Sequence, residues 1–80
     1  MFEAEIKITL KKTVADPQGL TIKHALESLG QKGISEVRMG KFVKMKLEAK
    51  DKAEADSQVS EMCRKLLANP IIEEYSFEIK

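Results

Sequence analysis

The chain has almost none of the side chains that build metal sites, disulfide frameworks or catalytic pairs. Its 80 residues include one cysteine, Cys63, one histidine, His24, and no tryptophan. A structural metal site or a disulfide scaffold needs several such residues, so neither can reinforce this fold. A domain of this size buries only about 60% of the surface that its unfolded chain exposes, and oligomerisation is the remaining common source of stability. We therefore expect the chain to associate with itself, at least as a dimer.

An excess of charge of one sign is also lacking. The 14 basic and 13 acidic residues are interspersed and give a formal net charge of +1. Because proteins that bind polyanions carry a basic patch, this balance predicts no nucleic-acid partner and no anionic membrane. Long apolar runs are missing too, since Glu3, Glu5 and Lys7 interrupt the N-terminal stretch. We expect no signal peptide and no transmembrane span, and a reduced thiol in the cytoplasm.

Apolar residues do recur at period two, which is typical of half-buried strands. The stretches with this alternation are residues 2–11, 42–49 and 72–79. Residues 34–39 form a shorter candidate strand. Gly40-Lys41 lies between this strand and the next, where a two-residue connection would stand, and glycine permits the positive φ of a primed turn. The sequence therefore predicts a hairpin at this point.

A first helix is expected after Asp16, a good N-cap residue, with Pro17 at the first helical position. Gly30 and Gly33 can end it and reverse the chain. The residues at helical spacing form an apolar stripe, which predicts that one side of this helix faces a core. They are Ile22, Ala25, Leu26 and Leu29.

A second helix is expected over residues 52–68, opened by Asp51 and stopped by Asn69-Pro70. Its apolar stripe consists of Ala55, Val59, Met62, Cys63 and Leu66. The resulting order, β-α-β-β-α-β, predicts an α+β fold of the ferredoxin-like sandwich type. In that fold a four-stranded antiparallel sheet carries two helices on one face, and residues 1–80 form a single domain.

None of the polar residues forms a convincing catalytic, cofactor or metal site. Gly40-Lys41 is followed by Phe42 and a strand, whereas a phosphate-binding loop needs GxxxxGK[ST] before a helix. His24 lies opposite the apolar stripe of its helix and has no evident partner. Cys63 lies within an apolar stripe, where cysteine usually behaves as a small inert hydrophobe. We predict that the chain alone has no catalytic residues.

The stretch VRMGKF, residues 37–42, has one feature that the fold does not require. Phe42 shares the parity of Lys44 and Lys46, so it belongs to the sheet face away from the helices. An aromatic residue on a solvated face is a sign of contact with another chain. Two interpretations stay open: a hairpin turn only, or a partner interface formed by Arg38, Gly40, Lys41 and Phe42.

Three segments carry more information than composition or periodicity. They are DPQG at 16–19, VRMGKF at 37–42 and MCRKLLANPIIEEY at 62–75. In this order, and in a chain of this length, they resemble the PurS family, the small subunits of phosphoribosylformylglycinamidine (FGAM) synthase. The resemblance covers essentially the whole chain. Gln31 departs from it, because the family pattern has an aromatic residue after Leu29-Gly30.

The resemblance implies a non-catalytic component of a purine-biosynthesis complex. Its partners would be a second copy of itself, a large synthetase subunit and a glutaminase subunit that frees ammonia. The complex would use ATP and glutamine to amidate formylglycinamide ribonucleotide, and the small subunit would bridge the other two and could aid ammonia transfer. The family's catalytic residues lie in the larger subunits, so no catalytic, cofactor or metal site transfers to this chain. ATP and Mg would be bound by the synthetase.

Two other classes share the expected fold. A stand-alone acylphosphatase-like enzyme would need an arginine in a glycine-rich anion loop after the first strand, and TVADPQG, residues 13–19, has none. A ligand-binding or RNA-binding module of this topology would display stacking aromatics on its central strands. The exposed sheet face offers mainly Phe42 among charges of both signs.

Overall fold

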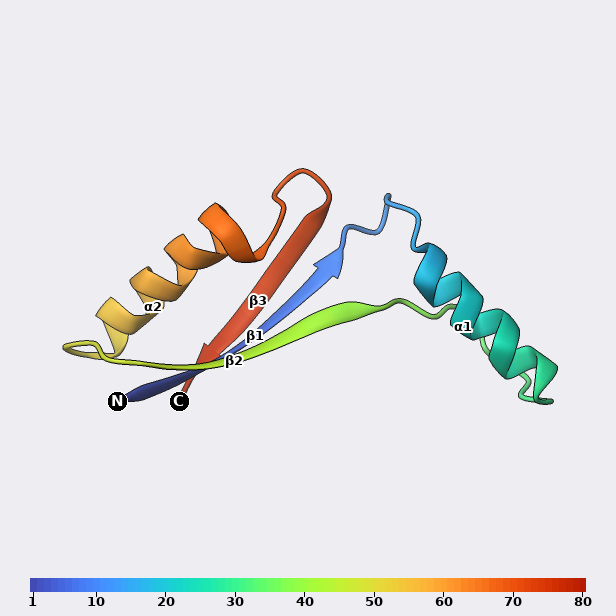
Figure 1. Cartoon of the computed structure of the whole chain (residues 1–80), viewed down its shortest axis with the longest axis horizontal. Helices are drawn as coiled ribbons and strands as arrows, with labels where there is room; N and C mark the ends of the chain where they lie inside the picture. The colour runs from blue at the N-terminus through green and yellow to red at the C-terminus, as the bar shows by residue number, and fades with distance from the viewer.

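The structure, a computed structural model, describes residues 1–80. Figure 1 shows two parts of different character. The body, residues 1–10 and 40–80, holds a sheet with one helix, and the arm, residues 11–39, projects away from the sheet. The elements are β1 (Phe2–Leu10), α1 (Pro17–Ser28), β2 (Gly40–Leu47), α2 (Lys52–Met62), a turn of π-helix named η1 (Cys63–Leu67), and β3 (Glu73–Ile79).

β1 lies at the centre of the sheet, with β2 and β3 antiparallel on either side of it. Ile6 lies opposite Val43 on one side and Phe77 on the other. Because side chains alternate between the two faces of a sheet, this register collects the apolar residues of all three strands on one face. The three strands predicted from alternation are confirmed, with bounds within two residues of those expected.

α2 covers the apolar face of the sheet over β1 and β3. Asp51 begins it, as predicted, by accepting a hydrogen bond from the backbone N–H of Glu54 at 2.8 Å. The predicted helix over 52–68 is α2 followed by η1, where the N–H of Ala68 donates to the carbonyl of Cys63. Cys63 is buried in the core, also as predicted. The core consists of Ala4, Ile6, Ile8, Ala55, Val59, Cys63, Ala68 and Ile79.

The sheet has three strands rather than the four that were predicted. Residues 34–39 belong to no strand of the chain, and no backbone–backbone hydrogen bond involves residues 32–39. α1 does not lie on the sheet either, so one helix covers it and not two. Alternation tells which side of an extended segment is apolar, but not which strand the segment pairs with. The prediction of a complete sandwich within one chain was wrong for that reason.

The arm is a helix followed by an extended return. Asp16 is the N-cap of α1 and Pro17 occupies its first turn, as predicted. Gly30 and Gly33, with φ values of 91° and 82°, let the chain reverse after the helix. Residues 34–39 then run back along α1 and continue straight into β2 (Figure 1). The result is an elongated molecule of 51 × 24 × 15 Å.

Candidate functional site

The stretch VRMGKF does not turn. Gly40 is the first residue of β2 and lies opposite Thr9 of β1, and its φ is not in the left-handed region that a primed turn would need. Glycine is needed here for the close approach of β2 to β1, because a Cβ at residue 40 would lie 2.8 Å from the carbonyl oxygen of Ile8. The predicted hairpin at Gly40-Lys41 is therefore wrong. The chain passes straight from the arm into the sheet.

The four residues proposed as a partner interface do not form one patch. The Arg38 guanidinium donates to the carbonyl oxygens of Lys11 and Val14, at 3.0 and 2.8 Å. Lys41 lies opposite Ile8, on the side of the sheet that α2 covers, whereas Phe42 points to the other side and is 55% exposed. Arg38 and Gly40 thus have structural roles within the chain. A contact between these residues and a partner stays a prediction.

A network of hydrogen bonds joins the two ends of the arm at its base. The carboxylate of Asp16 accepts from the N–H of Gly19 at 3.0 Å and from the N–H of Met39 at 2.6 Å. These bonds, the one from Gly19 first, lower the pKa of Asp16. A Cβ at Gly19 would clash with the carbonyl oxygen of Val37, so α1 and the returning segment cross at a glycine. A carboxylate already occupies this helix N-terminus, which leaves no anion site there.

We call the bonds made by Asp16 and Arg38 the arm-base network. Sequence reasoning found Asp16 as a helix cap, since capping is local. It missed the bond to Met39 and the role of Arg38, because their partners lie 23 to 27 positions away along the chain. The one signal in the sequence for these long-range bonds was the presence of a capping aspartate at one end of the arm and an arginine at the other.

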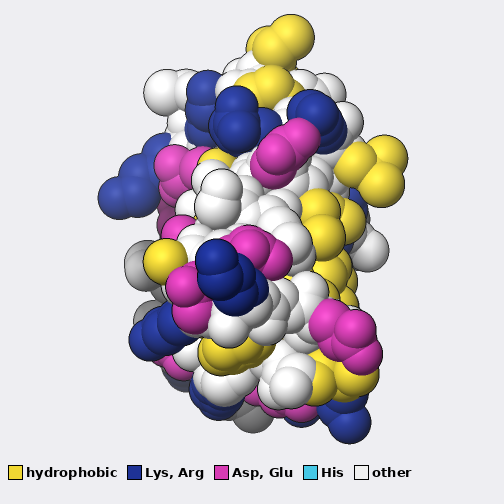
Figure 2. Space-filling view, turned by 90° about the vertical axis from the view of Figure 1, so that its left-hand side faces the viewer, with side chains coloured by type: hydrophobic (Ala, Val, Ile, Leu, Met, Phe, Trp, Pro, Cys, Tyr) yellow, Lys and Arg dark blue, Asp and Glu magenta, His cyan; other side chains and the backbone are white.

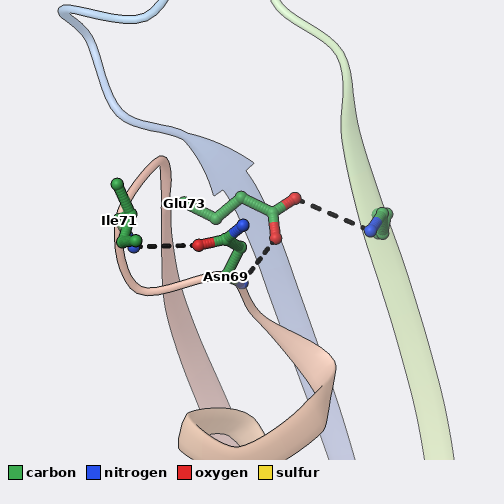
Figure 3. A network of polar contacts seen from close by, with 4 residues as sticks. Asn69, Ile71 and Glu73 are labelled. Atoms are coloured by element: carbon green, nitrogen blue, oxygen red, sulfur yellow. Dashed lines mark hydrogen bonds and ion pairs between the residues drawn. The ribbon is translucent and has the colours of Figure 1, made fainter.

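A second polar network holds the connection between η1 and β3 (Figure 3). Glu73 accepts from the N–H of Asn69 at 2.7 Å, and the Asn69 side chain accepts from the N–H of Ile71 at 3.0 Å. The other carboxylate oxygen of Glu73 lies 3.6 Å from the ammonium of Lys41 on β2. These bonds hold the turn in place from within the chain. The Ile71 side chain at its tip is 79% exposed.

A groove lies beside α2, where the helix leaves β2 uncovered. It has a volume of about 510 Å³. Its apolar members are Met45 from β2, Met62 from α2, and Leu66 and Leu67 from η1, and Leu66 is 84% exposed. Figure 2 shows hydrophobic side chains gathered in a column along one side of this end of the molecule, among charges of both signs. The polar members at the groove are Gln58, Glu61 and Lys65.

The molecule exposes more surface than a compact monomer of its size. Its accessible surface is 5993 Å², whereas about 4,900 Å² is typical of a globular chain of 9.0 kDa. The radius of gyration, 16.1 Å, likewise exceeds the roughly 12 Å expected for this length. The excess area, about 1,100 Å², is of the size that one partner buries in a standard protein interface. Large apolar side chains contribute to it, among them Leu20, Leu29, Leu66 and Ile71.

Groups capable of chemistry are few and scattered. No three His, Cys, Asp or Glu side chains converge to hold a metal ion. Burial raises the pKa of the Cys63 thiol, which disfavours the nucleophilic thiolate. His24 is exposed on the arm. No helix has the length and apolar character to cross a membrane.

Fold and surfaces together define a class: a small α+β protein whose distinctive features are its exposed apolar surfaces. Its family is defined by comparison with known proteins. Residues 3–80 match the family described as PurS, phosphoribosylformylglycinamidine (FGAM) synthase. The chain belongs to this family, as its signature segments suggested.

Individual relatives agree with this assignment. The chain is 45% identical over 78 residues to the FGAM synthase subunit PurS of Synechocystis, covering 98% of this chain and 78% of that protein. It is 40% identical over 80 residues to the PurS subunit of Bacillus subtilis, covering 100% of this chain and 94% of that protein. Both matches span the body and the arm.

Solved structures share the whole architecture. PurS of Methanocaldococcus jannaschii, described as one of the subunits of formylglycinamide ribonucleotide amidotransferase in the purine biosynthetic pathway, superposes with a TM-score of 0.90, 39% identity, and coverage of 100% of this chain and 96% of that one. A chain of the PurLQS structure from Thermotoga maritima gives a TM-score of 0.91 at 32% identity, covering 99% and 96%. Because the arm makes up about a third of the chain, such scores require its projecting position to be shared.

Proposed function

We propose that this chain is the small, non-catalytic subunit of an FGAM synthase complex and bridges a large synthetase subunit and a glutaminase subunit. The observation that carries the proposal is the agreement of the entire chain, arm included, with a chain of the Thermotoga maritima PurLQS structure. The complex would amidate formylglycinamide ribonucleotide with ATP and glutamine, in the cytoplasm. ATP and Mg would be bound by the synthetase, as the resemblance to the family implies.

The proposal includes a second copy of the chain as a partner. The arm has an amphipathic helix with nothing packed on its outer side, and the body has an apolar groove beside α2 and an unpaired edge on β2. In the fold predicted from the sequence, α1 would lie in that groove and residues 34–39 would pair with that edge. The arm of a second copy can fill both places. Each chain would then complete the sandwich of the other.

The unpaired backbone of the arm supports this arrangement. An extended segment whose N–H and C=O groups lack partners is a template for strand addition. Residues 34–38 are such a segment, whereas the N–H of Met39 is bound by Asp16, and β2 is such an edge. Reciprocal exchange satisfies both at once and has the twofold symmetry of most homodimers. The excess surface of about 1,100 Å² is enough for such an interface.

Reconstitution tests the scaffold function. The purified chain, mixed with the synthetase and glutaminase subunits of the same organism, should elute with them as one complex on gel filtration and should support glutamine-dependent FGAM formation. Alone it should neither hydrolyse ATP nor release ammonia from glutamine. Activity of the isolated chain that changes with His24→Ala or Cys63→Ser would contradict the proposal, as would full glutamine-dependent activity of the other two subunits without it.

Sedimentation equilibrium at micromolar concentration tests the dimer. The chain should sediment at twice 9.0 kDa. Leu66→Glu in the groove and Leu29→Glu on the arm should each shift the equilibrium towards monomer, because each would bury an unpaired carboxylate at the interface. Ser76→Glu, on the exposed sheet face, is the matched control and should leave the dimer intact. A wild-type chain that sediments only as monomer would exclude the exchange.

A further inference from the structure

The sequence is compatible with two positions of the arm. In a closed monomer, the chain would reverse at Gly40-Lys41, residues 34–39 would pair with β2, and α1 would fill the groove of its own chain. In the observed open form, residues 34–39 continue straight out of β2. A closed monomer and a dimer of two open chains would bury the same apolar residues, so the hydrophobic effect alone does not choose between one chain and two. A contact that is present in only one of the two forms must therefore determine which form is adopted.

The arm-base network is such a contact. Arg38 donates to the carbonyls of Lys11 and Val14, and Asp16 accepts from the N–H of Met39. In a closed hairpin, Arg38 would lie on the outer edge of the sheet, beyond β2. Because β2 would then separate it from the end of β1, it could not reach Lys11. The crossing of Gly19 and Val37 would be lost as well.

The bonds of this network are well formed. The Val14 carbonyl receives a charged donor, and so does the Lys11 carbonyl, which also accepts from the N–H of Val14 at 2.9 Å. Hydrogen bonds to charged groups are stronger than neutral ones. Arg38 is half-buried between the two ends of the arm. The network thus braces the connection from β1 to α1 against the segment that leads into β2.

We infer that Asp16 and Arg38 hold the arm open, and that this network selects exchange with a second copy over closure within one chain. The role in exchange rests on the proposed dimer. The opening of the arm is a property of one chain and is measured separately. The two residues are positioning residues in this inference and do not themselves contact the second copy.

Pulsed electron paramagnetic resonance can measure the opening. Spin labels are placed at Gln31→Cys, at the tip of the arm, and Lys50→Cys, after β2, in a chain whose buried thiol is removed by Cys63→Ala. In Figure 1 the turn after α1 and the connection from β2 to α2 lie at opposite ends of the molecule, whose longest extent is 51 Å. Labelled chain is mixed with excess unlabelled chain, so that only distances within one chain are recorded. We expect a single long distance.

The test variant combines Arg38→Ala with Asp16→Asn. Asparagine has one carbonyl oxygen, so it can cap α1 or accept from Met39 but not both. We expect a second, shorter distance from closed or mobile arms, and a dimer dissociation constant raised about tenfold or more. Arg38→Lys, which keeps the charge but not the forked donor, is a milder variant in case the double change unfolds the chain.

The matched control is Lys12→Ala with Glu36→Gln, which removes one exposed cation and one exposed anion and should keep the single long distance. The inference is overturned if circular dichroism shows both test variants folded and they also keep that distance. A wild-type monomer with a single long distance would exclude the dimer and leave the role of the network in opening the arm intact. A wild-type dimer whose test variants keep the single long distance would support the dimer and contradict the role of the network in opening the arm.

Discussion

The body has 24 apolar residues among 51 and the arm has 10 among 29, and the two parts use them differently. All eight residues of the core belong to the body, and so do the half-buried residues packed around it. In α1 only Gly19 is buried, and it packs against backbone. What separates the two parts is a second layer: β1 has α2 above it, whereas α1 has only one extended segment beside it.

This difference shows why a helix pattern does not ensure a buried helix. Short helices gain most of their stability from packing an apolar face against another element. α2 has such a face and such a partner within the chain. α1 has the face, but Leu29 is 78% exposed. The arm therefore needs a partner from outside the chain, and substitutions in the two parts should have different consequences.

The largest effect is expected at the centre of the body. Ile6→Ala deletes a fully buried side chain between β2 and β3 and should lower the free energy of unfolding by about 2–5 kcal/mol. Leu29→Ala on the arm should change it by less than about 0.5 kcal/mol at concentrations where the chain is monomeric. Urea unfolding followed by circular dichroism measures both. Equal losses would show that the arm is packed in solution on something that belongs to its own chain.

A smaller effect is expected where α1 and the returning segment of the arm cross. Gly19→Ala forces α1 away from Val37 and should cost about 1–3 kcal/mol, as overpacking usually does. It should also weaken self-association, because the arm would no longer fit its place. Gln18→Ala, one residue earlier and exposed, is the control. If Gly19→Ala changed neither the melting temperature nor the sedimentation profile, α1 would be packed less closely against Val37 than the structure shows.

The pH dependence of melting and of dimer formation should distinguish the body from the arm. The substitutions that test it leave side-chain volume nearly unchanged. The hydrogen bond from Lys80 lowers the pKa of Glu5 in the body, and the bond from Gly19 lowers that of Asp16 in the arm. Each carboxylate stabilises the folded state above its unfolded pKa of about 4, and loses this contribution as the pH falls through its lower folded value.

The melting temperature should therefore drop in acid, and Glu5→Gln should flatten this drop in a monomeric sample. Asp16→Asn should instead flatten the acid dependence of dimer formation, measured by sedimentation. A variant that flattens both profiles to the same extent would mean that body and arm unfold as one unit.

The smallest effect is expected at the exposed pair on α2 and η1. Lys65 lies 2.6 Å from Glu61, one helical turn away, and both side chains are largely exposed. Exposed pairs of this kind contribute little. Lys65→Ala should leave the melting temperature nearly unchanged, as should Lys12→Ala on the arm, which is exposed and unpaired. Because Lys65 borders the groove, a change in dimerisation with an unchanged melt would assign it to the interface.

Much of the local structure follows from the amino-acid sequence alone. Asp16 and Asp51 begin the helices, Asn69-Pro70 ends the second, and Cys63 lies in the core, all as their positions predict. These features depend on neighbours within a few positions, through capping, missing N–H groups and side-chain periodicity. The family follows too, because three segments in one order carry its signature.

The candidate site was predicted less well, for an equally physical reason. Arg38, Gly40, Lys41 and Phe42 are consecutive or nearly so, which suggested one exposed cluster beside a turn. In an extended chain, however, neighbours point to opposite faces. Lys41 meets Glu73 on one face, Phe42 lies on the other, and Arg38 reaches back to Lys11 and Val14. The exposed apolar groove and the tip at Ile71 depend on which strands α2 covers, and no pattern in the sequence states that.

By itself, then, the sequence determined three of the four predicted strands, the helices, their apolar faces and the need for a partner, because each of these is encoded by residues close together in the chain or by its length. Only the tertiary structure decided that the chain runs straight through Gly40 rather than turning there. That choice depends on bonds between residues 23 to 27 positions apart at the base of the arm. A closed monomer and a dimer of open chains would bury the same apolar faces, so hydrophobic periodicity serves both equally and cannot distinguish one chain from two.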